Sequence, residues 1–129
     1  MDLMEGLLWL ALNIYFEARN QPLQGQYAVA HVTLNRAART GKSIKAVVLE
    51  PGQFSWVRQQ GVTWKTPVAK IPIREKAAFE RCKKVARTAY LMSDPTGGAT
   101  HYHASYVRPK WSKALKRTAR IGKHIFYRR

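Results

Sequence analysis

An apolar run near the N-terminus, from Leu7 to Ile14, leads into the carboxylate of Glu17 and constrains the fold more than any other feature. At about 100° per residue, Leu7, Leu10, Ile14 and Glu17 fall on one stripe of a helix. Apolar residues also occupy the other faces, which indicates that this helix, predicted over residues 2–17, is buried. The sequence therefore places an acid at the end of a core helix.

The surroundings predicted for Glu17 suit a general acid. Burial disfavours the ionised carboxyl, and the negative end of the helix dipole acts in the same direction, so both raise its pKa. A carboxyl that keeps its proton near neutral pH can protonate a leaving group. The alternative is a Glu that turns outward at the helix end and pairs with Arg19, because most Glu side chains are exposed.

The remaining patterns predict an α+β fold that is mainly helical. Amphipathic spacing predicts helices over residues 23–38, 44–49 and 73–92, and β-forming residues predict strands over 99–105 and 120–127. A length of 129 residues suits one core, and no linker divides the chain. We therefore expect a single catalytic domain, residues 1–129, with a small β element near the C-terminus.

The formal net charge of +16 indicates an anionic partner, such as nucleic acid, a membrane surface or an acidic polymer. The apolar run is too short to span a membrane. Asp2 and Glu5 precede it, where a secretory signal would carry Lys or Arg. The sequence thus predicts neither a signal peptide nor a transmembrane segment.

The candidate groups for acid–base chemistry are few, because the chain contains only seven Asp and Glu residues. Glu17 alone lies in an apolar context. Glu50 and Asp94 lie at turns and are the possible second acids for a mechanism with two carboxylates. Neither belongs to a recognisable motif, so a mechanism with one essential acid fits better.

A zinc site is the main alternative for the histidines. His101 and His103 would share one face of a strand, and His124 follows downstream. The chain has no His-Glu-x-x-His motif and only one cysteine, Cys82, so we expect hydrogen-bonding histidines and neither a metal nor a cofactor.

Several local motifs, in order, resemble the spore cortex-lytic type of cell-wall hydrolases. The resemblance covers nearly the whole chain and rests on residues 14–19, 25–36, 51–56, 100–103, 109–111 and 121–127. It implies a lysozyme-like domain that acts on peptidoglycan, with Glu17 of the Glu-Ala-Arg motif as the catalytic acid. The family commonly carries a second Glu shortly after this motif, where Asn20 and Gln21 stand here, and this favours one carboxylate.

The resemblance predicts a lytic transglycosylase that cleaves between N-acetylmuramic acid and N-acetylglucosamine. The alternatives are a muramidase that uses water with the same Glu, and a basic module that binds nucleic acid or disrupts membranes. Aromatic rings in loops could stack on sugars or cap the core. The candidate substrate-binding residues are Asn35, Gln53, Ser55, Trp56, Tyr102, Trp111 and His124.

The predicted biological setting is a phage endolysin that acts as a monomer. It would wait in the host cytoplasm until a holin opens the membrane, and would then reach the periplasm or cell wall. Its partners would be peptidoglycan glycan strands and, through its basic surface, the anionic cell envelope, with no specific nucleic acid.

Overall fold

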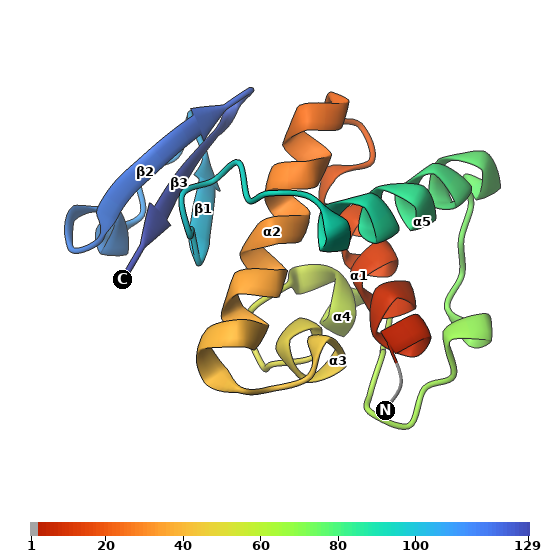
Figure 1. Ribbon diagram of the computed structural model, residues 1–129. Helices are drawn as coiled ribbons and strands as arrows, with labels where there is room; N and C mark the ends of the chain where they lie inside the picture. Colours follow the sequence, from red (N-terminus) through yellow and green to blue (C-terminus); the bar gives the residue numbers. More distant parts are fainter. Residues whose placement is uncertain (1–2) are drawn as a thin grey trace.

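Helix α1 (Leu3–Ala18) packs against most of the helical part of the protein, as Figure 1 shows for the computed structural model, which describes residues 3–129. Trp9, Leu10, Leu12 and Ile14 are all almost fully buried. The prediction of a core helix is confirmed, although Asp2, its predicted first residue, lies outside the described residues. Side chains on opposite faces of α1 enter different parts of the core, as expected for a helix without a polar face.

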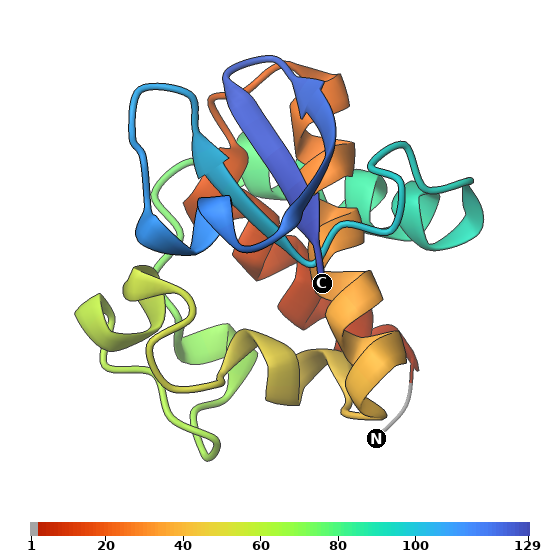
Figure 2. The ribbon, with the colours of Figure 1, turned by 90° about the vertical axis from the view of Figure 1, so that its left-hand side faces the viewer.

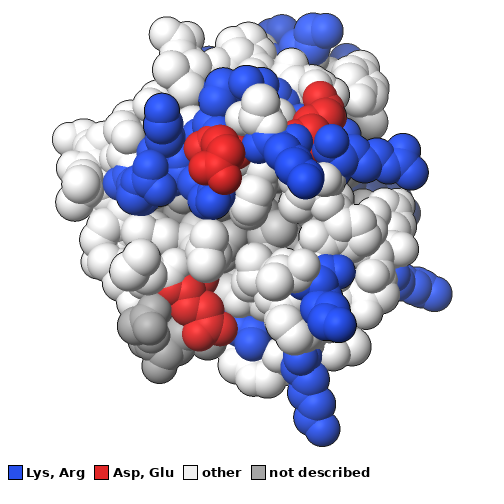
Figure 3. Space-filling view, turned by 90° about the vertical axis from the view of Figure 1, so that its right-hand side faces the viewer, with Lys and Arg blue, Asp and Glu red and all other residues white. Residues whose placement is uncertain are grey.

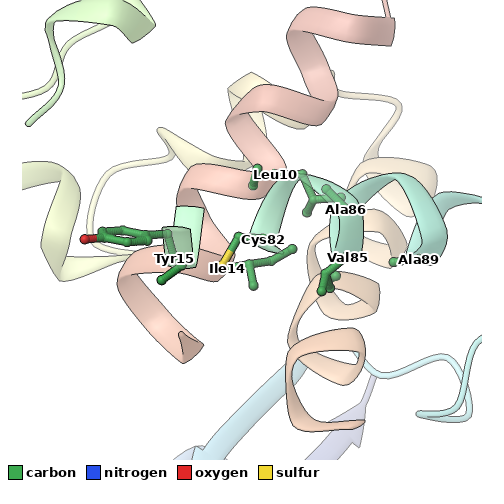
Figure 4. Packing of buried hydrophobic residues seen from close by; sticks show 10 residues of the cluster. Leu10, Ile14, Tyr15, Cys82, Val85, Ala86 and Ala89 are labelled. Atoms are coloured by element: carbon green, nitrogen blue, oxygen red, sulfur yellow. The ribbon is translucent and has the colours of Figure 1, made fainter. Parts of the chain in front are cut away.

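The first part of the core joins α1 to α2 (Leu23–Thr40) and α5 (Lys76–Leu91). Figure 4 shows Leu10 and Ile14 of α1 against the small side chains of α5, while the ring of Tyr15 points away from them. Helix α2 ends at Gly41, whose φ of 70° is available to glycine at little cost and whose N–H donates to the carbonyl oxygen of Ala37. These three helices form the body on which the other elements pack.

The second part of the core lies on another side of α1 and holds the segment that follows α2. This segment contains α3 (Ile44–Val48), α4 (Ser55–Gln59) and the 3₁₀ helix η1 (Val68–Lys70). Trp9 and Leu12 of α1 pack in one cluster with Val48, Phe54 and Trp56. Because this packing anchors residues 48–56 to α1, it also fixes them beside Glu17 at its C-terminal end.

A three-stranded antiparallel sheet lies beside α2 (Figures 1 and 2). Its order is β1 (His101–Ala104), β3 (His124–Arg128), β2 (Lys116–Ile121), and the 3₁₀ helix η2 (Lys110–Lys113) precedes β2. The sheet covers α2 with a small cluster in which Phe126 packs on Ala28 and Val32. The predicted α+β class, mainly helical with a C-terminal β element, is confirmed.

The single strand predicted over residues 120–127 is wrong. The chain reverses at Gly122 and Lys123, and Ile121 pairs with His124 across the turn. Gly122 has a φ of 58°, which suits the first central position of a two-residue hairpin turn. The alternation of residues on both sides of the glycine concealed this reversal. Within the part of the chain described, no helix has the length and apolar character needed to cross a membrane.

Candidate active site

A groove with a volume of about 890 Å³ runs past the C-terminal end of α1. Glu17 forms one part of its wall, and residues 49–62, which follow α3 and include α4, form the rest. Gln53 and Ser55 line the groove with exposed side chains, so the structure brings these two predicted residues together with the predicted acid. The other lining residues are Leu49, Glu50, Pro51, Gly52, Phe54, Val57, Arg58, Gln59 and Val62.

Glu17 is partly buried and receives a hydrogen bond from strand β1. The hydroxyl of Tyr102 donates to Oε1 of Glu17 at 2.8 Å, which joins the end of the first helix to the sheet. Burial raises the pKa of Glu17 above its ordinary value, and the Tyr102 hydrogen bond and the charge of Arg36 oppose this only in part. The hydrogen bond occupies Oε1, so Oε2 is the oxygen left to carry a proton.

Tyr102 is itself kept neutral in this position. Burial, and then the neighbouring charge of Glu17, raise its pKa well above the ordinary value. A neutral phenol can donate to the carboxyl in either protonation state of Glu17. Tyr102, predicted to hold the sugar, therefore has a clear positioning role toward the acid in this structure.

Arg36 is the main residue of this region that the sequence analysis did not select. Its Nε donates to the carbonyl oxygen of Thr100 at 2.6 Å, and its Nη1 donates to Oε1 of Gln53 at 2.8 Å. One guanidinium thus ties helix α2 to both the sheet and the groove. The sequence did contain a signal that could have identified Arg36. It lies on the same stripe of α2 as the buried Val29 and Val32, and a cation in such a position requires specific partners.

Asn35 and Asp94 have structural tasks near the start of the sheet. The amide of Asn35 donates to Oδ2 of Asp94 at 3.0 Å and to the carbonyl oxygen of Ala99 at 2.8 Å. Burial raises the pKa of Asp94, but hydrogen bonds from Thr96, Asn35 and Gly98 outweigh it and lower the pKa below its ordinary value. Neither side chain lines the groove, so Asn35 is not placed to bind sugar there and Asp94 is not placed to act as a second acid.

Trp56 corrects the prediction of an exposed stacking platform. Its side chain is 3% exposed, its ring stacks on Phe16 with centroids 4.5 Å apart, and its Nε1–H donates to Oδ1 of Asn13 at 2.8 Å. The ring is held inside the protein because helix α4 packs its first turn against α1. Trp56 supports the groove from behind and has no free face for a sugar.

The structure does not bring Trp111 or His124 into the groove either. Trp111 packs against His103 and Tyr127 on the face of the sheet opposite Tyr102. His124 lies beside Tyr102, with ring centroids 5.2 Å apart, and burial lowers its pKa. Its Nδ1 is buried and has no hydrogen-bond partner among the described residues. Residues 3–129 contain no group of three or more His, Cys, Asp or Glu side chains arranged to hold a metal ion.

Comparison with known proteins identifies the family. The family model described as Cell Wall Hydrolase matches residues 20–127. The chain belongs to the cell wall hydrolase family. This confirms the resemblance inferred from the sequence motifs. The fold is shared with the catalytic domain of the germination-specific lytic transglycosylase SleB from Bacillus anthracis, at a TM-score of 0.76, with 28% identity and coverage of 99% of this chain and 97% of that one.

Two further relatives from Bacillus cereus agree with this assignment. The catalytic domain of its SleB protein superposes with a TM-score of 0.70 and 30% identity, covering 96% of this chain and 91% of that chain. A spore cortex-lytic enzyme from the same species is 34% identical over 120 residues, which are 91% of this chain and 42% of that protein. The chain therefore spans about two fifths of the length of this curated relative.

The hydrogen bond between Tyr102 and Glu17 gives this cell wall hydrolase a testable pH dependence. Because the Tyr102 hydroxyl lowers the pKa of Glu17, Tyr102→Phe should raise it further. If the protonated acid is the active form, the alkaline limb of the kcat/KM profile moves to higher pH. Tyr106→Phe, at a side chain that is 83% exposed, is the control and should leave the profile unchanged. An unmoved limb, or one displaced to lower pH, would contradict the role of this contact.

Proposed function

We propose that this domain cleaves peptidoglycan glycan strands as a lytic transglycosylase with Glu17 as its one essential carboxyl group. The observation that carries the proposal is the position of Glu17, partly buried at the wall of the groove, with its pKa raised and one oxygen held by Tyr102. The mixed polar and apolar walls of the groove suit a sugar chain, which presents both hydroxyls and ring faces.

The reaction requires one group that first donates and then accepts a proton. Glu17 protonates the oxygen between N-acetylmuramic acid and N-acetylglucosamine as the bond from the muramyl C1 breaks. The resulting carboxylate takes the proton from the muramyl C6 hydroxyl, whose oxygen bonds to C1. The products are a 1,6-anhydro end and a free hydroxyl on N-acetylglucosamine, and Glu17 is again protonated. Tyr102 holds the carboxyl throughout, and Arg36 orients Gln53 at the groove.

Hydrolysis is the second candidate, and one observation favours it. Glu50 is the other carboxylate in the wall of the same groove, and its Oε1 lies 3.5 Å from Nζ of Lys42. An ionised Glu50 could activate a water molecule for attack on C1. Glu50→Gln would then abolish lysis, whereas the one-acid mechanism expects this variant to retain most of its rate.

Product masses decide between the two reactions. Digestion of purified peptidoglycan should give muropeptides with 1,6-anhydro ends, which are lighter by one water molecule than reducing ends. Mass spectrometry before and after borohydride treatment separates the two, because only a reducing end takes up hydrogen. Reducible ends as the main product would refute transglycosylation and leave a muramidase.

The setting of a phage endolysin, held in the host cytoplasm and released by a holin, stays a prediction. The net charge of +16 supports attraction to an anionic envelope, and Figure 3 shows a band of Lys and Arg side chains across the upper part of one face, with acidic residues among them. Expression in a bacterium with and without a co-expressed holin tests it. Lysis that requires the holin is the expected result, and lysis without it would contradict the proposed route.

A further inference from the structure

A second hollow, with a volume of about 400 Å³, lies on the outer face of the sheet, away from Glu17. Neighbouring residues of a strand point to opposite faces, and Tyr102 of β1 contacts Glu17 while the next residue, His103, lines this hollow. Figure 2 shows the molecule from the side of the sheet, with the three strands in front of the helices. We call this hollow the outer pocket, and its polar lining includes His103, Arg108, Lys113, Arg117, Arg120 and Tyr127.

An irregularity in β2 brings two arginines into the outer pocket. Residues three apart on a regular strand point to opposite faces, which would separate Arg117 from Arg120. The register shifts between Arg117 and Ala119, so that Arg117 lies opposite Tyr127 and Arg120 lies opposite Ile125. Tyr127 and Ile125 both line the pocket. The β-bulge therefore turns both guanidinium groups to the same side, which is a recognised use of bulges near binding sites.

The positive charge of the outer pocket has no acidic counterpart. Four Lys and Arg side chains line it together with no Asp or Glu, and none of the four forms an ion pair among the described residues. Like charges held around one hollow repel each other, and an anion between them would relieve that repulsion. Guanidinium groups in particular match the oxygens of a phosphate through paired hydrogen bonds.

We propose that the outer pocket binds a phosphate group carried on a saccharide, as in the anionic glycopolymers of a cell envelope. The volume suits one sugar phosphate unit, and four cations line this one hollow together with His103 and Tyr127, whose side chains can contact a sugar. Because the pocket opens on the face opposite Tyr102, a bound polymer leaves the catalytic groove free. The site would hold the enzyme on a phosphate-bearing wall while Glu17 works on glycan strands.

The test is an NMR titration of the isotope-labelled chain with glucose 1-phosphate at 0.15 M salt. Resonances of β2 and of residues 108–113 should shift, and the double variant Arg117→Gln/Arg120→Gln should bind roughly tenfold more weakly or worse. The matched control, Arg81→Gln/Lys84→Gln on the exposed face of α5, removes the same charge far from the sheet and should retain the parent affinity.

The other outcomes would overturn the proposal. Equal weakening in both double variants would mean that net charge alone attracts the ligand. Inorganic phosphate bound as tightly as glucose 1-phosphate would remove the saccharide from the assignment. A short DNA duplex bound through the two arginines, with no binding of glucose 1-phosphate, would assign the pocket to nucleic acid. Digestion of phosphate-free peptidoglycan should not depend on Arg117 or Arg120, so this test is separate from that of Glu17.

Discussion

The Glu17→Gln variant is expected to digest peptidoglycan roughly 10²- to 10⁴-fold more slowly than the parent enzyme, which is the usual effect of losing a general acid. The amide has the shape of the carboxyl and still accepts the hydrogen bond from Tyr102, but it has no proton to give to the glycosidic oxygen. The rate is measured as the release of soluble muropeptides. Glu80→Gln, at an exposed position of α5, removes one negative charge elsewhere and serves as the control.

The stability of the Glu17→Gln variant, measured as a function of pH, distinguishes a loss of catalysis from misfolding. Burial raises the pKa of Glu17 above its value in the unfolded chain, so the native state holds the proton more tightly. The stabilisation linked to that proton is complete below the unfolded pKa and is lost as the pH rises through the folded pKa. Gln has no proton to lose at this position, so the Glu17→Gln variant does not lose this stabilisation. Its stability relative to the parent protein should therefore increase as the pH rises. A folded Glu17→Gln variant with the parent's lytic rate would remove Glu17 from the mechanism.

Trp56→Ala is expected to lower the free energy of unfolding by about 3–5 kcal/mol, the usual cost of truncating a large buried ring. The change empties the space against Phe16 and leaves the buried Oδ1 of Asn13 without its donor. A domain of this size has a free energy of unfolding of roughly 5–15 kcal/mol, so the variant would lose a large part of its stability. Urea denaturation followed by circular dichroism measures the difference.

Trp64→Ala provides the matched control for this experiment. Trp64 is 53% exposed, and its ring meets Nζ of Lys45 at 4.3 Å from the centroid, so its loss should cost about 1 kcal/mol or less. If Trp56→Ala kept the parent stability and instead weakened glycan binding, the ring would be a sugar platform after all. The comparison thus tests whether Trp56 belongs to the core or to the substrate site.

The sequence could single out Glu17 as the candidate acid because its signal is local. The apolar period of α1 determines which residues are buried, and Glu17 follows on the same stripe, so its environment could be inferred without knowing its partners. Gln53 and Ser55 were likewise found through a short motif after a Pro-Gly turn. The residues that contact Glu17 were harder to predict, because Tyr102 lies 85 residues further along the chain. No local pattern reports a contact across such a distance.

The prediction of an exposed Trp56 was wrong, and Trp111 lies outside the groove, for a related reason. Trp56 and Trp111 both follow turns, and a turn indicates accessible backbone without saying which way the ring points. Packing of α4 against α1 turned the first ring inward, and the pairing of β1 with β3 placed the second on the outer face. The hairpin at Gly122 was concealed because a two-residue turn barely interrupts the alternation of its strands.

Sequence alone predicted the family and the helical core and proposed Glu17 as the acid, since these depend on residue types and on periods of 3.6 residues along one segment. Tertiary structure decided what surrounds Glu17, which is the Tyr102 contact and the hydrogen bond from Arg36 to Gln53. On the opposite face of the sheet it also decided the bulge that turns Arg117 and Arg120 to one side. The physical reason is that strand register and helix packing are set by the whole core at once, and they bring together groups that the chain keeps far apart.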